Sequence, residues 1–112
     1  PWFNADNVRK QFNDWDFSYE GRVRQATRMK DITINCPNDP KFVVADFVAP
    51  TAEIRDIFDA DYVIWVDTIN ESHFEDTNNI FEIPITYDMR VVTQNAEEWA
   101  ALIERLILSN EN

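Results

Sequence analysis

The chain has 112 residues, of which 45% are hydrophobic and 13% aromatic, and its formal net charge is -11. This length fits one α/β domain near the small end of the usual range, and the hydrophobic content argues against a disordered chain. The charge argues against a surface for nucleic acid polymers or for anionic membranes, because both are bound through cations. We therefore expect one acidic domain over residues 1–112 that binds neither.

The cysteine and glycine counts limit the chemistry further. Cys36 is the one cysteine, which leaves no disulfide within the chain and fits a reducing compartment. No apolar stretch approaches the roughly 20 residues that span a bilayer, and no signal-peptide pattern opens the sequence. We therefore expect a cytoplasmic protein. Gly21 is the one glycine, so the 112 residues contain no GxxxxGK[ST] or GxGxxG phosphate loop.

The first quarter predicts a strand end and two helices. Pro1 leads directly into Trp2 and Phe3, as if the chain began inside an element, so we expect further residues upstream. Asn4 or Asp6 can cap the first helix, with Val8 and Phe12 facing inward. Ser18 is a second N-cap, for a helix to about Lys30. The stretch at 35–40, NCPNDP, then breaks the pattern.

The stretch from Phe42 to Thr68 predicts a β-α-β unit. Its apolar runs, Phe42–Val48 and Tyr62–Val66, are typical of parallel strands covered on both faces. Between them, Thr51 can cap a short helix that reaches Phe58. Asp46 lies near the end of the first strand and Asp67 at the end of the second, at the edge of an open α/β sheet where ligands bind.

The last third predicts a loop, a strand and a helix. Residues 68–82 are polar and without period, which indicates a long loop or a helical lid. A short strand follows at 89–92, and Asn95 with Glu98 forms a capping box. The helix after it should pack on the sheet through residues spaced three and four apart, which are Trp99, Leu102, Ile103, Leu106 and Ile107.

The arginines gather in the first quarter of this acidic chain. Arg24 and Arg28 share a helical face, which we expect to be solvated, with Glu20 pairing with Arg24. Arg22 lies on the opposite side, with Ala26 and Met29. A guanidinium on that side must meet an anionic ligand or an internal carboxylate, and both alternatives stay open.

Three aspartates, Asp6, Asp46 and Asp67, lie at predicted strand ends. Carboxylates that converge at a sheet edge can hold Mg²⁺ through its waters. Each also has a structural alternative, since Asp6 can be an N-cap and Asp67 a cap or turn residue.

Several segments, in order, resemble the adenylylsulfate (APS) kinases, a family of P-loop kinases. Residues 4–9, NADNVR, with Phe17, Ser18 and Arg22, resemble the family's DGDNVR…GFSEEDR. Residues 47–50, FVAP, are similar to its FISP loop, and residues 66–68 match its VDT. Residues 75–81, EDTNNIF, resemble the lid segment RDPKGLY. The resemblance implies a three-layer, mostly parallel α/β fold and phosphoryl transfer from Mg-ATP to the ribose 3′-hydroxyl of adenylylsulfate.

The resemblance also assigns roles to individual residues. Phe17 would stack on the adenine, while Arg9 and Arg22 would hold the phosphosulfate. Gln25 stands where the family has an asparagine that helps to hold the substrate. Asp6 would lie near Mg²⁺ and the accepting hydroxyl as the catalytic residue. Asp46 departs from the family, which usually has a small apolar residue there, but it is a second candidate metal ligand because an aspartate near a strand end can organise Mg²⁺ in P-loop proteins generally. Ala49 and Pro50 would line the substrate through backbone groups.

The sequence also departs from the family pattern. Asn4 replaces the first aspartate, Glu75 the lid arginine and Asn78 the lid lysine. The family's first strand, P-loop and following helix would precede Pro1, so these residues alone are expected to be inactive as a kinase. A sheet without that central strand would expose an unpaired edge, which upstream residues, a rearranged strand order or a homo-oligomer would cover. The alternative function is a non-catalytic domain that binds a nucleotide or another anion, or that serves in interactions.

Overall fold

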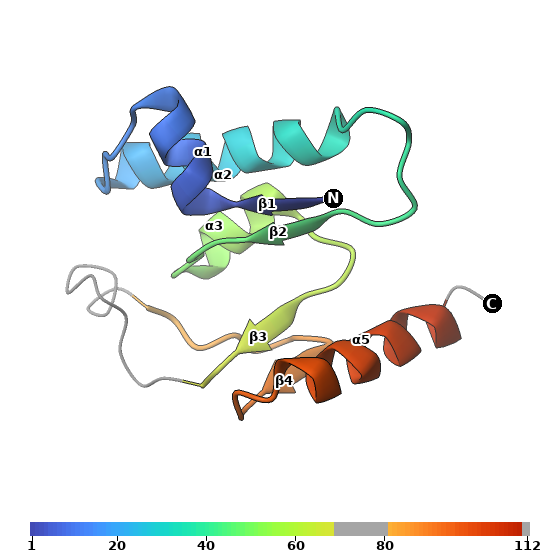
Figure 1. Cartoon of the computed structure of the whole chain (residues 1–112). Helices are drawn as coiled ribbons and strands as arrows, with labels where there is room; N and C mark the ends of the chain where they lie inside the picture. Colours follow the sequence, from blue (N-terminus) through green and yellow to red (C-terminus); the bar gives the residue numbers. More distant parts are fainter. Residues whose placement is uncertain (69–80, 111–112) are drawn as a thin grey trace. The chain divides into compact units, whose positions relative to one another are not determined.

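The computed structural model describes residues 1–68 and 81–110 (Figure 1). The described residues form two compact units. Unit 1 comprises residues 1–60 with 81–83, and unit 2 comprises residues 61–68 with 84–110. Each unit is described by itself, so the expectation of one domain over residues 1–112 stays a prediction.

Unit 1 is built from two short parallel strands and three helices. Its elements, in order, are β1 (Trp2–Asn4), α1 (Ala5–Phe12), α2 (Tyr19–Ile34), β2 (Val44–Asp46) and α3 (Ala52–Phe58). Strands β1 and β2 pair in parallel, with Phe3 opposite Ala45. Helix α2 packs against α3 and also contacts α1 and β2 (Figure 1).

Side-chain caps begin all three helices of unit 1. Asn4, not Asp6, caps α1, and its side chain accepts a hydrogen bond from the Asn7 amide at 3.2 Å. Ser18 and Thr51 cap α2 and α3 in the same way, as the sequence predicts. Each cap satisfies an amide that would otherwise lack a partner, which stabilises a helix by about 1 kcal/mol.

The interior of unit 1 lies where α1, α2 and α3 meet. Its buried apolar side chains are Val8, Ala26, Met29 and Ile54, and Pro50 is fully buried as well. Val8 is thus inward as expected, but Phe12 is half-exposed and lies under the guanidinium of Arg28 at 4.3 Å. The prediction for Phe12 is wrong because α1 ends at this residue, where the following turn leads the chain away.

The strands are shorter and more exposed than their apolar runs predict. Within Phe42–Val48 only Val44–Asp46 is strand, and within Tyr62–Val66 only Ile64–Val66. Val44 and Val66 are 56% and 65% exposed, so the expectation of strands covered on both faces is wrong for them. The described residues form two sheets of two strands each, and so small a sheet covers little of its own surface.

Unit 2 combines a second parallel strand pair with the last helix. Its elements are β3 (Ile64–Val66), β4 (Met89–Val91) and α5 (Ala96–Asn110). Asn95 accepts a hydrogen bond from the Glu98 amide at 3.3 Å, and the two side chains also bond, which confirms the cap. The predicted inward positions of α5 are each half-buried: Trp99, Leu102, Ile103, Leu106 and Ile107.

The predicted loop or lid at 68–82 falls mostly on residues 69–80, which lie outside the described residues, and so do Glu75 and Asn78. Its described end, Phe81 and Glu82, has neither helical nor strand conformation. No helix within residues 1–68 and 81–110 has the length and hydrophobicity needed to cross a membrane.

Met29 offers a direct test of this core. Its side chain is fully buried in α2, so Met29→Ala leaves a cavity and should lower the free energy of unfolding by about 2–5 kcal/mol. Ile34→Ala, at the exposed end of the same helix, is the matched control and should change it by less than about 0.5 kcal/mol. Urea denaturation measures both, and equal losses would contradict this account of the core.

Candidate functional site

A small cavity in unit 1 brings together most of the predicted site residues. It has a volume of about 40 Å³. Its lining comes from α1, the turn before α2, α2 itself, the segment after β2, and α3: Ala5, Asp6, Arg9, Phe17, Arg22, Gln25, Phe47, Val48 and Ile54. Five of the seven residues predicted to act on substrate therefore share one cavity, although they lie up to 19 positions apart in the sequence.

Arg9 places a buried positive charge in the cavity wall. Its side chain is only 5% exposed, and its Nη1 donates to the carbonyl oxygens of Asp14 (3.0 Å) and Asp16 (3.1 Å). Among the described residues no carboxylate forms an ion pair with Arg9. Burial lowers the pKa of Arg9 from its ordinary value, and the charge of Asp14 offsets part of this. An anion in the cavity would therefore stabilise the guanidinium.

Phe17 lies beneath both arginines of the site. The Arg9 guanidinium is 4.3 Å from the centre of the Phe17 ring, and that of Arg22 is 5.6 Å away. Arg22 is buried, as its place in the helix predicts, and its Nε donates to the carbonyl oxygen of Phe17 at 2.8 Å. A guanidinium over an aromatic face is stabilised by about 0.5–2 kcal/mol. The three side chains thus hold one another in place along one wall.

Gln25 is fixed at both ends of its amide. Nε2 donates to the carbonyl oxygen of Ala5 at 3.1 Å, and Oε1 accepts a hydrogen bond from Arg28 at 3.0 Å. The first bond ties α2 to the start of α1, next to Asp6. Gln25 therefore positions the cavity wall, and it keeps one N–H available for a ligand.

Asp14 organises the arginines that surround the cavity. Its carboxylate accepts from Arg24 at 2.7 Å and from Arg28 at 3.0 Å. These bonds, first from Arg24 and then from Arg28, hold the pKa of Asp14 well below its usual range. The predicted partner of Arg24, Glu20, is wrong, because the turn before α2 brings Asp14 and Asp16 within reach of the guanidinium.

Arg28 also differs from its prediction. It was expected on a solvated face with Arg24, but its side chain is only 14% exposed, against 46% for Arg24. The bonds of Arg28 to Asp14 and Gln25 draw it inward.

Gly21 allows this turn to close against α2. A Cβ at Gly21 would lie against the Asp16 carbonyl oxygen and 2.7 Å from the carbonyl carbon. This is the carbonyl that receives Arg9. Gly21, the one glycine of the chain, thus leaves room for the Asp16 carbonyl that accepts a hydrogen bond from Arg9.

The three aspartates at strand ends have different surroundings. Asp6 lines the cavity, whereas Asp46, at the end of β2, accepts a hydrogen bond from the Asn4 side chain at 3.0 Å. Asp67 belongs to unit 2, where it forms an ion pair with Arg90. In the part of the chain that the structure describes, no three His, Cys, Asp or Glu side chains gather to hold a metal ion. Mg²⁺ at Asp6 and Asp46 therefore stays a prediction.

Ala49 and Pro50 lie beside the cavity, and neither lines it. Their carbonyl oxygens accept hydrogen bonds from Arg55 at 2.9 and 3.3 Å. Val48, directly before Ala49, and Ile54, four positions after Pro50, do line the cavity. Sequence reasoning missed Arg55. No local pattern marks it, because its three carbonyl acceptors are brought together only by the fold.

Comparison with solved structures identifies the fold. The structure of the Mycobacterium tuberculosis APS kinase CysC in complex with AMPPNP and APS matches with a TM-score of 0.77 and 18% sequence identity, over 95% of this chain and 78% of that one. A cysteine-to-alanine mutant of the same kinase matches with a TM-score of 0.71 and 19% identity, over 95% and 73%. Neither a model of any protein family nor any curated protein matches the sequence. The fold is therefore the α/β fold of the APS kinases, as the sequence predicts.

Gly21→Ala tests the packing of the site. Alanine normally favours a helix by about 1 kcal/mol over glycine, but here its methyl group meets the Asp16 backbone. We expect the free energy of unfolding to fall by about 1–3 kcal/mol. Thr27→Ala, at an exposed position of α2, should change it by less than about 0.5 kcal/mol. Thermal denaturation measures both, and a stabilised Gly21→Ala would refute the close packing.

Proposed function

We propose that the cavity of unit 1 is a binding site for an anionic adenine nucleotide of the adenylylsulfate type. The single observation that carries this proposal is the buried guanidinium of Arg9, whose described hydrogen-bond acceptors are neutral carbonyl oxygens. A ligand with a sulfate or phosphate group supplies the charged partner that Arg9 lacks among its described acceptors, in hydrogen bonds that guanidinium groups form well.

The composition of the wall supports the same ligand. Arg22 adds a second buried guanidinium, and Phe17 and Phe47 add aromatic surface for a planar base. Two arginine side chains, Arg9 and Arg22, line this cavity although the chain as a whole carries a formal charge of -11. The likeness in fold to an APS kinase solved in complex with AMPPNP and APS points in the same direction.

The size of the cavity sets a condition on binding. A volume of about 40 Å³ holds a group the size of a few water molecules, whereas pockets for whole ligands measure roughly 300–1,000 Å³. The wall must therefore move outward to admit a nucleotide. The segment after β2 and helix α3 supply three of the lining residues, Phe47, Val48 and Ile54.

Phosphoryl transfer would need more than this site. Asp6 lies in the cavity wall, where its carboxylate can accept the proton of a substrate hydroxyl and bind a water of Mg²⁺. A loop to hold the ATP phosphates needs backbone amides in a glycine-rich turn, and these 112 residues include one glycine. We propose ATP and Mg²⁺ as cofactors only for a form that also contains such a loop.

The composition therefore favours a second function, a domain that binds the nucleotide without turning it over. In this alternative Arg9 and Arg22 serve recognition alone, and Asp6 serves no proton transfer. The two functions share one site and differ in catalysis.

Binding is tested by titrating adenylylsulfate into the protein by calorimetry. Arg22→Ala removes a buried donor of charge-assisted hydrogen bonds, each worth about 1.5–3 kcal/mol, so we expect affinity to fall roughly 10- to 150-fold. Arg105→Ala, at an exposed position of α5, should leave affinity unchanged. If the wild-type chain takes up neither adenylylsulfate nor ATP, the proposed site does not exist.

Catalysis is tested in an ATP-dependent coupled assay with adenylylsulfate and Mg²⁺. We expect no turnover above background from residues 1–112 alone, because they lack a glycine-rich phosphate loop. A clear rate that disappears in Asp6→Ala would show that the chain holds ATP in another way and would overturn this expectation.

A further inference from the structure

Arg55 gathers backbone oxygens from two distant parts of unit 1. From helix α3, its Nε donates to the Ala49 carbonyl at 2.9 Å, and its Nη2 donates to the carbonyls of Pro50 (3.3 Å) and Glu82 (2.5 Å). Ala49 and Pro50 follow β2, whereas Glu82 lies 27 positions beyond Arg55. One planar guanidinium therefore binds three carbonyl oxygens that no regular element brings together.

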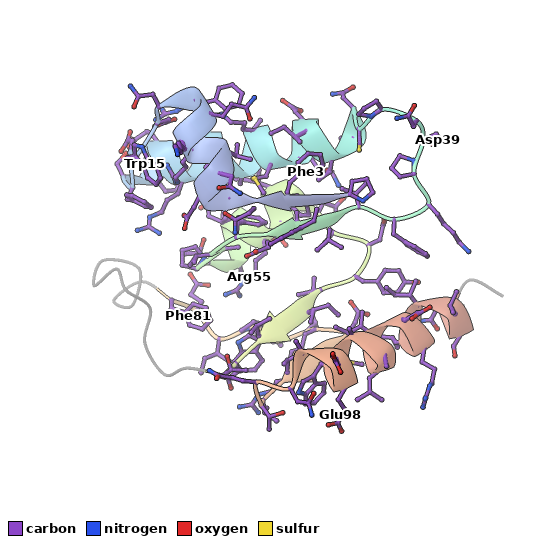
Figure 2. All side chains as sticks on the ribbon, in the orientation of Figure 1. Phe3, Trp15, Asp39, Arg55, Phe81 and Glu98 are labelled. Carbon is purple, nitrogen blue, oxygen red and sulfur yellow. The ribbon has the colours of Figure 1, made fainter. Side chains whose placement is uncertain are left out.

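Further contacts hold Glu82 in the same place. Its amide donates to the Pro50 carbonyl at 2.6 Å, and its carboxylate accepts from the Ala52 amide at 3.2 Å, at the start of α3. The neighbouring Phe81 lies beside the Arg55 guanidinium, with 5.4 Å between the ring centre and Cζ (Figure 2). Phe81 and Glu82 are thus held against Arg55 and the loop Ala49–Pro50, which follows β2.

This loop carries one wall of the cavity. Val48 precedes Ala49, and Ile54 precedes Arg55, and both line the cavity. The hydrogen bond from Arg55 to Ala49 closes the segment between these two residues into a compact turn. The Thr51 cap, which accepts the Ile54 amide at 3.2 Å, stabilises the same turn. Any outward movement of this wall must break or carry along the contacts of Arg55.

We propose that Arg55 is a positioning residue, which joins the docked segment Phe81–Glu82 to the loop Ala49–Pro50 and so sets the position of the cavity wall formed by Val48 and Ile54. Its effect on ligand binding rests on the function proposed above. Arg55 does not line the cavity, so it acts on the ligand through the loop. Burial lowers its pKa, which fits a guanidinium placed for its hydrogen bonds more than for contact with water.

The test compares Arg55→Met, Arg55→Lys and the control Arg105→Met in two measurements. The first is the amide hydrogen exchange of Glu82, whose N–H donates to the Pro50 carbonyl, measured by NMR without ligand. The second is the affinity for adenylylsulfate. Arg55→Met should speed exchange at Glu82 and weaken binding, each by about tenfold or more. Arg105→Met should change neither more than twofold.

Arg55→Lys separates positioning from charge. Lysine keeps the positive charge but cannot reproduce the three-way fork, so we expect it to resemble Arg55→Met in both measurements. Affinity that stays at the wild-type value in Arg55→Lys, with unchanged exchange at Glu82, would overturn the proposal. Arg55→Lys also decides the matter if Arg55→Met does not fold.

Glu82→Ala removes the carboxylate at Ala52 but keeps the backbone groups that Arg55 and Pro50 bind, so its effects should be smaller than those of Arg55→Met. Larger effects would show that the Glu82 carboxylate, and not its backbone groups, holds the segment in place, which would contradict the proposal.

The two proposals can fail separately. If wild type does not bind adenylylsulfate, the proposed function fails, and exchange at Glu82 alone decides whether Arg55 holds the loop. If wild type binds and Arg55→Met binds equally well, the site stands and Arg55 has no positioning role.

Discussion

The guanidinium of Arg9 is buried with its charge, and it donates to two carbonyl oxygens of the turn between α1 and α2. Burying a charge costs several kcal/mol unless hydrogen bonds and nearby charges compensate, so the turn must keep its shape. Asp14 holds that shape through Arg24 and Arg28, and Gly21 leaves room for the Asp16 carbonyl. The local structure of α1, the turn and the start of α2 therefore depends on one desolvated cation.

The same constraint gives the site its chemistry. Asp14 and Asp16 form ion pairs with Arg24, and Asp14 also pairs with Arg28, whereas Arg9 meets only carbonyl oxygens among its described acceptors. The cavity therefore has an excess of positive charge, although the whole chain is strongly acidic. This local positive charge attracts a small anion. Phe47, Val48 and Ile54 add apolar surface to the same cavity, and we propose that the hydrogen bonds of Arg55 set the position of Val48 and Ile54. A cavity lined by both charged and apolar side chains suits a ligand with an anionic group and a planar ring.

Sequence reasoning found the parts of this site that local rules determine. The inward place of Arg22 follows from helical periodicity, and the caps at Asn4, Ser18, Thr51 and Asn95 follow from side-chain chemistry next to each helix. Arg9 and Phe17 came from the resemblance alone. The role of Asp14 was missed because it depends on how a turn folds back onto a helix. Arg55 was missed because its acceptors come from segments about 30 positions apart, and strand lengths were overestimated because apolar runs do not reveal how many strands pair.

The central claim is that Arg9 and Arg22 receive an anionic nucleotide in unit 1. The most direct measurement follows the ¹⁵N NMR signals of the arginine Nε–H groups while adenylylsulfate is added. This account predicts saturable shifts for Arg9 and Arg22, with the signals of Arg90 and Arg105 in unit 2 unchanged. Saturable shifts confined to Arg90 or Arg105, or small non-saturating shifts of all arginines together, would contradict it.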